Sequence, residues 1–368
     1  MQQEELYVKT AAPMLKSFME GYNVTIMAYG QTGSGKTYTM GTAAATQGED
    51  CQGLIPRFVT DLFENLVLSN ENSDVKEEDA TLPSSPHNKD GTETEKDSKS
   101  SEFKNKVTIS FLEIYGEDVY DLLSNNASAS VNTNERASLS VREDEKGIVF
   151  VQGQHEESVN NASEALHYLD IGTRNRITAS TGMNSTSSRS HAVFTVTLDQ
   201  VIQNKEDEDD VHHITSKLTF VDLAGSERVK RTGAEGQRLR EGIQINSGLF
   251  NLGQVINSLA DEQRIKQGLK AAHIPYRNSK LTHLLKDALG GNSQTLFLAC
   301  VSPAESNESE TYSTLCYARQ ARNIQNKPVK NMDQTSLEIR KLKLALKTWM
   351  VKACGFMYYN GNGALTAG

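Results

Sequence analysis

Residues 30–37 read GQTGSGKT and match the pattern G-x-x-x-x-G-K-[ST]. Glycines in such a loop let backbone N–H groups turn inward around a phosphate chain. Lys36 would neutralise the outer phosphates, and the hydroxyl of Thr37 would hold a magnesium ion. An apolar run at 24–29 precedes the loop, where the strand that feeds it should lie. The pattern predicts binding of a nucleoside triphosphate, with a glycine-rich turn that binds nothing as the less favoured alternative.

Two later segments carry residues that could complete such a site. Asp222 ends the apolar run 218–221 and is followed three residues later by Gly225. An acid at a strand end can hold magnesium through water, and a glycine N–H can donate to a terminal phosphate. Residues 184–191, NSTSSRSH, offer hydroxyls for magnesium and for an attacking water. Taken alone, Asp222 could equally be a helix cap or turn residue, and 184–191 a polar turn.

Hydrophobic periodicity predicts alternating strands and helices after the loop. The apolar run at 296–301 is short and does not alternate, as expected of a strand covered on both faces. The pattern predicts an α/β fold, a P-loop NTPase with a mostly parallel central sheet flanked by helices on both faces. Strands are expected at 24–29, 107–115, 147–151, 191–202, 217–223 and 296–301, and helices at 37–40, 54–68, 162–173, 243–260, 279–289 and 307–325.

Charge is unevenly distributed along the chain. The 38 basic and 47 acidic residues leave a formal net charge of −9. Residues 71–103 carry −6 and residues 205–210 carry −4, so the rest is close to neutral and can present a basic face. The polar segment at about 70–103 is too poor in apolar residues to fold, which predicts a disordered acidic insert. Spacing of the four cysteines predicts neither a disulfide framework nor a zinc site.

Seven strings resemble the kinesin motor domain, and they occur in that family's order. They cover nearly all residues from Gln3 to Pro328. The sequence that follows the fourth string looks most like the chromokinesin branch of the family. The strings are AYGQTGSGKTYTMG, FLEIYGEDVYDLL, TGMNSTSSRSHAVF, LTFVDLAGSER, INSGLFNLGQVINSLA, IPYRNSKLTHLLKDALGGNSQTLFLACVSP and YARQARNIQNKP.

The resemblance implies that ATP and Mg²⁺ bind this chain. Thr37 and Ser188 are the implied magnesium ligands, with Asp222 one water away. The implied phosphate cradle consists of Gly30, Gln31, Thr32, Gly33, Ser34, Gly35, Lys36 and Thr37, followed by Tyr38 near the adenine.

The resemblance also implies roles in hydrolysis. Ser187 and Ser188, with the N–H of Gly225, would place the attacking water. Arg189 and Glu227 would form an ion pair that holds the segment 184–191 against the segment 222–227. Glu227 would also relay the proton of the water. Closure that needs the terminal phosphate suits phosphoryl transfer, which depends on positioning and charge neutralisation. An ordinary surface ion pair is the alternative. Asn246 matches an asparagine that supports the closed state.

A microtubule partner is implied as well, and its acidic surface calls for clustered basic residues. Solvated charge is the alternative for each of them. Two positions depart from the family, with Ser247 where many relatives carry Lys and His283 where many carry Arg. Both changes predict weaker binding, or pH-sensitive binding through His283. The candidate track residues, which would contact the microtubule, are Arg228, Lys230, Arg231, Arg238, Arg240, Arg277 and Lys280.

Residues 1–326 are expected to form the motor domain and residues 327–368 a neck linker with a short amphipathic helix. Relatives carry several dozen residues before the segment that resembles 3–7, so the motor domain is expected to be incomplete and to lack the family's first strand. Ile339, Leu342, Leu346 and Trp349 recur at helical spacing. They could begin a dimerising coiled coil, although a frayed amphipathic helix is favoured.

Two functions remain open from the sequence. The favoured one is a microtubule-stimulated ATPase motor of the cytoplasm and cytoskeleton. The alternative is a microtubule-binding module with weak or no ATP turnover, because the segment that holds the adenine is missing. A helicase or a small GTPase fits poorly, since no N-K-x-D string follows the phosphate loop where it should. Neither a membrane nor a nucleic acid partner is predicted.

Overall fold

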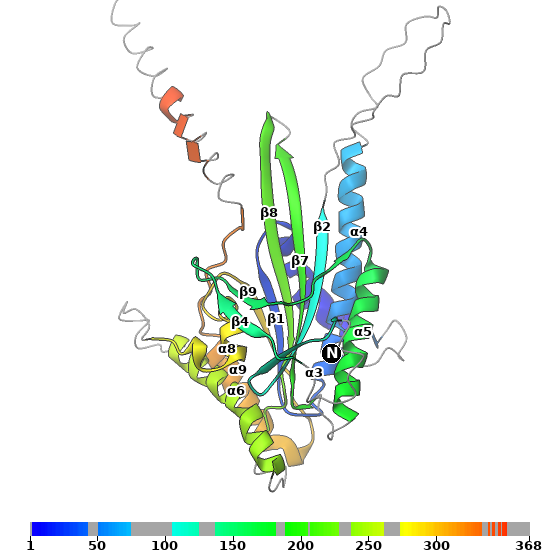
Figure 1. Cartoon of the computed structure of the whole chain (residues 1–368), viewed down its shortest axis with the longest axis vertical. Coiled ribbons are helices and arrows are strands. Elements are labelled where there is room, and N and C mark those ends of the chain that lie inside the picture. The colour runs from blue at the N-terminus through cyan, green and yellow to red at the C-terminus, as the bar shows by residue number, and fades with distance from the viewer. Residues whose placement is uncertain are drawn as a thin grey trace, which may run out of the picture.

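A mixed β-sheet lies at the centre of the molecule in a computed structural model of the chain (Figure 1). The structure describes residues 2–42, 51–74, 105–124, 137–181, 188–204, 207–227, 237–260 and 273–332, and scattered positions between 338 and 351. Seven described strands form the sheet in the order β3-β2-β7-β8-β1-β9, with β6 paired to β2. They are β1 (Val24–Tyr29), β2 (Lys106–Tyr115), β3 (Asp118–Asp121), β6 (Glu157–Val159), β7 (His191–Asn204), β8 (Asp207–Asp222) and β9 (Gln294–Ala299).

Helices cover both faces of this sheet. One face packs against α1 (Gln3–Leu6), the π-helical turn η1 (Tyr7–Ala11), α2 (Ala12–Met19), α4 (Leu54–Asp74) and α5 (Ala162–Thr181). The other packs against α6 (Gln237–Leu259), α8 (Lys280–Leu284), α9 (Glu308–Ala321) and the hairpin of β4 (Ser140–Glu143) and β5 (Val149–Gln152). Short helices are α3 (Lys36–Met40), η7 (Tyr276–Asn278) and η8 (Glu305–Asn307).

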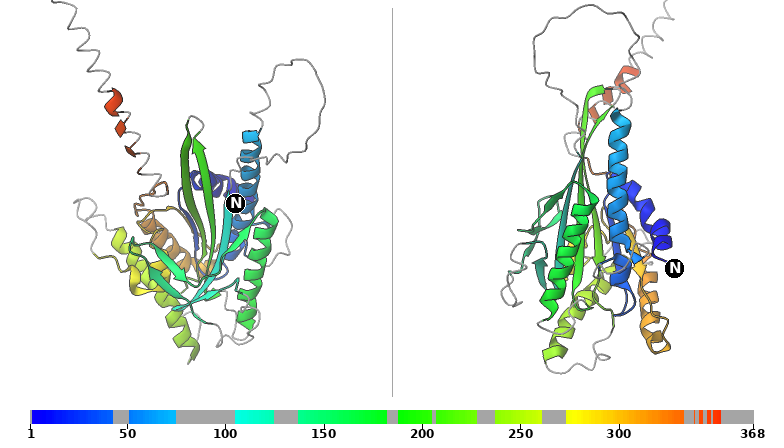
Figure 2. Two further views of the ribbon diagram at one scale, coloured as in Figure 1. Left: turned by 45° about the horizontal axis from the view of Figure 1, so that its top comes forward. Right: turned by 90° about the vertical axis from the view of Figure 1, so that its right-hand side faces the viewer.

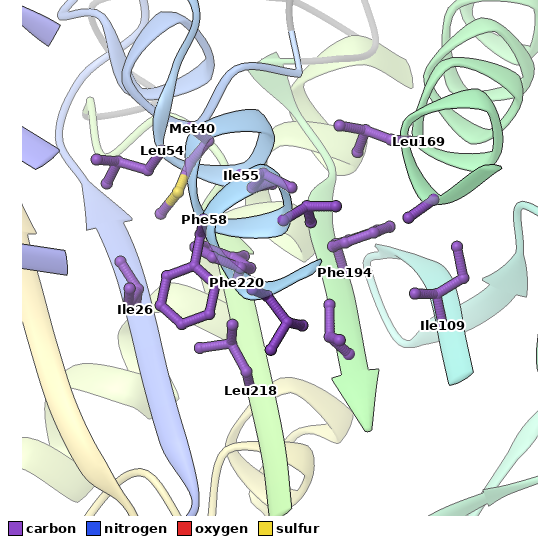
Figure 3. Close-up of a cluster of buried hydrophobic side chains, with 14 of the residues drawn as sticks. Ile26, Met40, Leu54, Ile55, Phe58, Ile109, Leu169, Phe194, Leu218 and Phe220 are labelled. Carbon is purple, nitrogen blue, oxygen red and sulfur yellow. The ribbon is translucent and has the colours of Figure 1, made fainter. Parts of the chain in front are cut away.

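Alternation along β1 explains why both faces need helices. Ile26 and Ala28 point into one core, whereas Met27 and Tyr29 point into the other. Figure 3 shows Phe58 of α4 among the side chains of the first core, and its ring meets that of Phe220 edge to face at 5.7 Å. Burial on both sides places β1, and the loop that leaves it, on a rigid platform.

Strand direction differs from the expectation of a mostly parallel sheet. Only β1 is parallel to its neighbours β8 and β9 within the described sheet, and the other ladders are antiparallel. β7 ends at Asn204 and β8 begins at Asp207, and so short a connection can join only antiparallel strands. Figure 2 shows this long hairpin extending beyond the other strands. The predicted α/β class with helices on both faces is confirmed, and the sheet is mixed.

Several boundaries and the burial of one strand also differ. β8 begins ten residues earlier than the predicted strand at 217, inside the acidic run 205–210. α4 continues to Asp74, so the first residues of the predicted insert are helical, and the remainder at 75–103 lies outside the described residues. β9 ends the sheet, and its six residues are half-buried rather than covered on both faces. An apolar run does not reveal whether a strand has one neighbour or two.

Candidate nucleotide site

The phosphate loop leaves β1 and enters α3, as the sequence predicts. Gly30 has φ of +154°, and a Cβ there would collide with the carbonyl oxygen of Cys300. Gly35 has φ of +95°, and the space beside it is open. Only glycine suits both positions, the first because of crowding and the second because of its left-handed backbone. The loop is therefore shaped to approach a ligand with its backbone.

Lys36 is held inside this loop. Its side chain is 7% exposed, and Nζ donates hydrogen bonds to the carbonyls of Gly30 at 2.8 Å and Gln31 at 2.9 Å. Burial lowers the pKa of Lys36, and the nearby carboxylates of Asp222 and Glu227 oppose that shift. A buried ammonium group held by carbonyl oxygens gains a stronger partner when phosphate oxygens arrive.

The three predicted segments meet around this lysine. The N–H of Gly225 donates to the carbonyl of Ser188 at 2.8 Å. This bond joins the hydroxyl-rich turn, which belongs to the segment 184–191, to the DLAGSER turn, which begins at Asp222. The N–H of Ser226 donates to the carbonyl of Gly30 at 3.1 Å, which joins the second turn to the phosphate loop. Ser187 lies outside the described residues. Segments about 150 to 190 residues apart in sequence thus form one site.

Asp222 offers an oxygen that suits a magnesium site. Thr37 Oγ1 donates to Asp222 Oδ2 at 2.8 Å, and the aspartate is 3% exposed. Asp222 Oδ1 is buried and has no hydrogen-bond partner among the described residues. A buried carboxylate oxygen normally has a partner. A metal-bound water would supply one, and hydroxyl and carboxylate oxygens are the ligands that Mg²⁺ prefers.

Arg176 of α5 also lies in the candidate site, although no pattern in the sequence indicated it. Its guanidinium donates to Asp222 Oδ2 at 3.2 Å and to the carbonyl of Ser190 at 3.0 Å, and it lies 3.9 Å from a carboxylate oxygen of Glu113. The arginine and both carboxylates are almost fully buried. The predicted helix ended at 173, which left Arg176 in an apparent loop, whereas α5 continues to Thr181.

His191 ends the predicted segment 184–191, but no role of its own was predicted for it from the sequence. Its Nδ1 accepts a hydrogen bond from the N–H of Ala224 at 3.0 Å. Complete burial, together with the charges of Arg176 and Lys36, lowers the pKa of His191 to about 3. The imidazole is therefore neutral and serves as an acceptor that positions the strand end before Gly225.

Glu227 contacts the phosphate loop itself. One carboxylate oxygen accepts from the N–H of Thr32 at 2.8 Å and the other from the Thr32 hydroxyl at 2.6 Å. Asn246 of α6 donates to the carbonyl of Glu227 at 3.4 Å, which links this turn to α6. The expected pairing of Glu227 with Arg189, which is half-buried beside Ser188, stays a prediction. Tyr38 is 45% exposed at the exit of the loop.

The candidate track residues are only partly described. Arg277 pairs with Glu143 at 2.6 Å, and Lys280 Nζ donates to the carbonyl of Leu139 at 3.4 Å. Ser247 is exposed on α6. Arg238 and Arg240 lie in the first turns of α6, where only the backbone is described, and Arg228, Lys230 and Arg231 lie outside the described residues.

Residues 327–332 follow α9 and pass the residues that precede β1 and β9. The N–H of Val329 donates to Asn292 Oδ1 at 2.6 Å, and the N–H of Asn331 donates to the carbonyl of Gly21 at 2.9 Å. Met332 forms a bridge with Ile214 of β8. The segment expected to be the neck linker is thus docked on the sheet by backbone and amide hydrogen bonds.

No helix in the described ranges combines the length and the apolar character that crossing a bilayer requires.

Replacing Arg176 with methionine should lower the free energy of unfolding by about 3–5 kcal/mol, because two buried carboxylates would lose their cation. Arg174 is the matched control, since it lies on the same helix and pairs with Asp170 at the surface. Arg174→Met should cost less than about 1 kcal/mol. Urea unfolding of both variants checks this, and equal losses would contradict the assigned role of Arg176.

His191 should make stability fall on acidification. The unfolded chain binds this proton near pH 6.5 and the folded chain only near pH 3, so stability is lost as pH falls through that window. Between pH 7 and 5 the loss should be roughly 2 kcal/mol. His191→Asn keeps an acceptor for Ala224 but does not titrate, so its urea midpoint should change less over that range. Identical pH profiles would refute this assignment.

The chain is similar to proteins of one known family. The kinesin motor domain family matches residues 1–324. Kinesin-like protein KIN-4C of Arabidopsis thaliana is 41% identical over 97% of this chain and 26% of its own length. Chromosome-associated kinesin KIF4B of Homo sapiens is 44% identical over 93% of this chain and 24% of its own length. The chain thus spans about a quarter of these relatives.

Solved structures agree with this assignment. A KIF14 dimer in complex with a microtubule and AMP-PNP has a TM-score of 0.74 and 40% identity, over 93% of this chain and 82% of that chain. A fast kinesin has a TM-score of 0.70 and 34% identity, over 91% and 80% respectively. The chromosome-associated relatives also agree with the predicted chromokinesin-like branch. The family match, these relatives and the fold agree with one another, and this chain is a member of the kinesin motor domain family.

Proposed function

We propose that this chain hydrolyses ATP in a cycle that is stimulated by microtubules and drives movement along them. The observation that carries the proposal is the hydrogen bond from Gly225 to Ser188, next to the buried ammonium of Lys36. The proposal is supported because two turns that could sense a terminal phosphate lie close to the loop that could hold it. Relatives named as kinesins and a neighbour solved with AMP-PNP support the same conclusion.

In the proposed reaction, a water oxygen attacks the γ-phosphorus and the bond to the bridging oxygen breaks. Ser187, Ser188 and the N–H of Gly225 orient the water, and Glu227 takes up its proton. Lys36 and the loop N–H groups neutralise charge that develops on the phosphates. A magnesium ion held by Thr37, Ser188 and, through water, Asp222 would neutralise the remaining phosphate charge.

Glu227 is the residue that we propose changes partner during the cycle. Its carboxylate contacts Thr32 in this structure. A terminal phosphate would compete for the loop N–H groups and release Glu227 from Thr32, and we propose an ion pair between Glu227 and Arg189 in that state. Asn246 contacts the carbonyl of Glu227, so that movement would reach α6. Because Arg277 and Lys280 lie close to α6 in η7 and α8, the change would alter the basic surface offered to tubulin.

Residues 1–326 serve as the motor domain in this proposal, and 327–332 as the neck linker that docks on the sheet. Leu342, Leu346 and Trp349 are exposed after the segment 327–332, where they suit pairing with a second copy of the chain. We place the protein on microtubules of the cytoskeleton.

The 368-residue chain should hydrolyse ATP faster when microtubules are added. Glu227→Ala should reduce the stimulated turnover by about 100-fold or more, because the proton acceptor is lost. Glu64→Ala on the exposed side of α4 is the control and should leave turnover unchanged. A coupled phosphate-release assay gives the rates.

Co-sedimentation with microtubules separates the alternative function. Binding without stimulated turnover in the unmodified chain would identify a microtubule-binding module that does no mechanical work. Loss of both properties would contradict the family-wide activity for this chain.

A further inference from the structure

One carboxylate neutralises part of the candidate track surface. Glu143 ends β4, and its two oxygens accept hydrogen bonds from Arg277 Nη2 and Lys286 Nζ, each at 2.6 Å. His283 Nε2 lies 3.3 Å from the same carboxylate. The hairpin of β4 and β5 packs on α8, and Figure 1 shows β4, α8 and α6 on the same side of the molecule.

These contacts keep Glu143 charged. The hydrogen bonds from Lys286 and Arg277 lower the pKa of the Glu143 carboxyl to about 2. The carboxylate is therefore ionised at neutral pH, and one of the neighbouring positive charges is cancelled locally. Arg277 is the outer partner, with a side chain that is 77% exposed. Exchange of an exposed arginine between two carboxylates costs little free energy.

We propose that Glu143 is an internal counter-anion that competes with the acidic surface of tubulin for Arg277 and Lys286, and thereby restrains microtubule affinity. This inference rests on the proposed function, since it concerns the strength of the same binding. Tubulin carboxylates would have to displace Glu143 or share its partners. The carboxylate thus lowers affinity and favours release from the track.

The hairpin does not depend on this carboxylate for its position. Lys286 Nζ also donates to the carbonyl of Gly147 at 3.0 Å, and Lys280 Nζ donates to the carbonyl of Leu139. Val141 and Val151 contribute to the core beneath. Replacing the carboxylate with an amide of the same shape should therefore leave the hairpin in place.

Glu143→Gln is the test, and Glu145→Gln is its matched control. Both remove one negative charge from the same hairpin, but Glu145 is exposed in the turn between β4 and β5. Microtubule dissociation constants of the full 368-residue chain are measured with AMP-PNP at several salt concentrations. Glu143→Gln should bind about three- to tenfold more tightly and with a steeper salt dependence, and Glu145→Gln less than about twofold more tightly.

A second variant checks the route. In a chain that already carries Arg277→Gln, the gain from Glu143→Gln should shrink to less than half, because the main released cation is absent. Equal gains from Glu143→Gln and Glu145→Gln would overturn the inference in favour of bulk charge. Weaker binding by Glu143→Gln would overturn it too, since Glu143 would then organise the surface. Failure of the unmodified chain to bind would instead refute the proposed function.

Discussion

The buried carboxylate of Asp222 is the constraint around which the candidate nucleotide site is assembled. It accepts a hydrogen bond from Thr37 at the end of the phosphate loop and pairs with Arg176 of α5, which in turn holds Ser190. A charge that is removed from water must keep its partners, because an unpaired one costs several kcal/mol. The phosphate loop, the hydroxyl-rich turn and α5 are therefore tied to the end of one strand.

Around this fixed centre, two carboxylates occupy positions that can change. Glu227 contacts Thr32 in the phosphate loop, and Glu143 contacts Arg277 beside α8. Each is close to the surface, and in the proposed cycle another anion competes for the groups that each contacts, a phosphate in the case of Glu227 and tubulin in the case of Glu143. The sheet and the Asp222 network supply rigidity, and exchange of partners by these two acids supplies the proposed switching.

Local signals in the sequence indicated several of the residues that meet at the centre of the candidate site. The loop glycines, Lys36 and Asp222 follow apolar strands, and the structure places them together because β1 and β8 are parallel neighbours. Contacts between distant segments left no such signal. Arg176, His191 and Glu143 act through partners 14 to 143 residues away, so no spacing pattern reveals them. Strand direction was predicted wrongly because the charged run 205–210 does not reveal how short the connection between β7 and β8 is.

We propose that Ser188, Gly225 and Glu227 respond together to the terminal phosphate. The resulting conformational change would reach the basic surface through α6. Microtubule affinity of the chain, measured side by side with AMP-PNP and with ADP, addresses it most directly. The account predicts binding at least about tenfold tighter with AMP-PNP, a coupling of about 1.4 kcal/mol or more. Equal affinity in the two nucleotide states would contradict it.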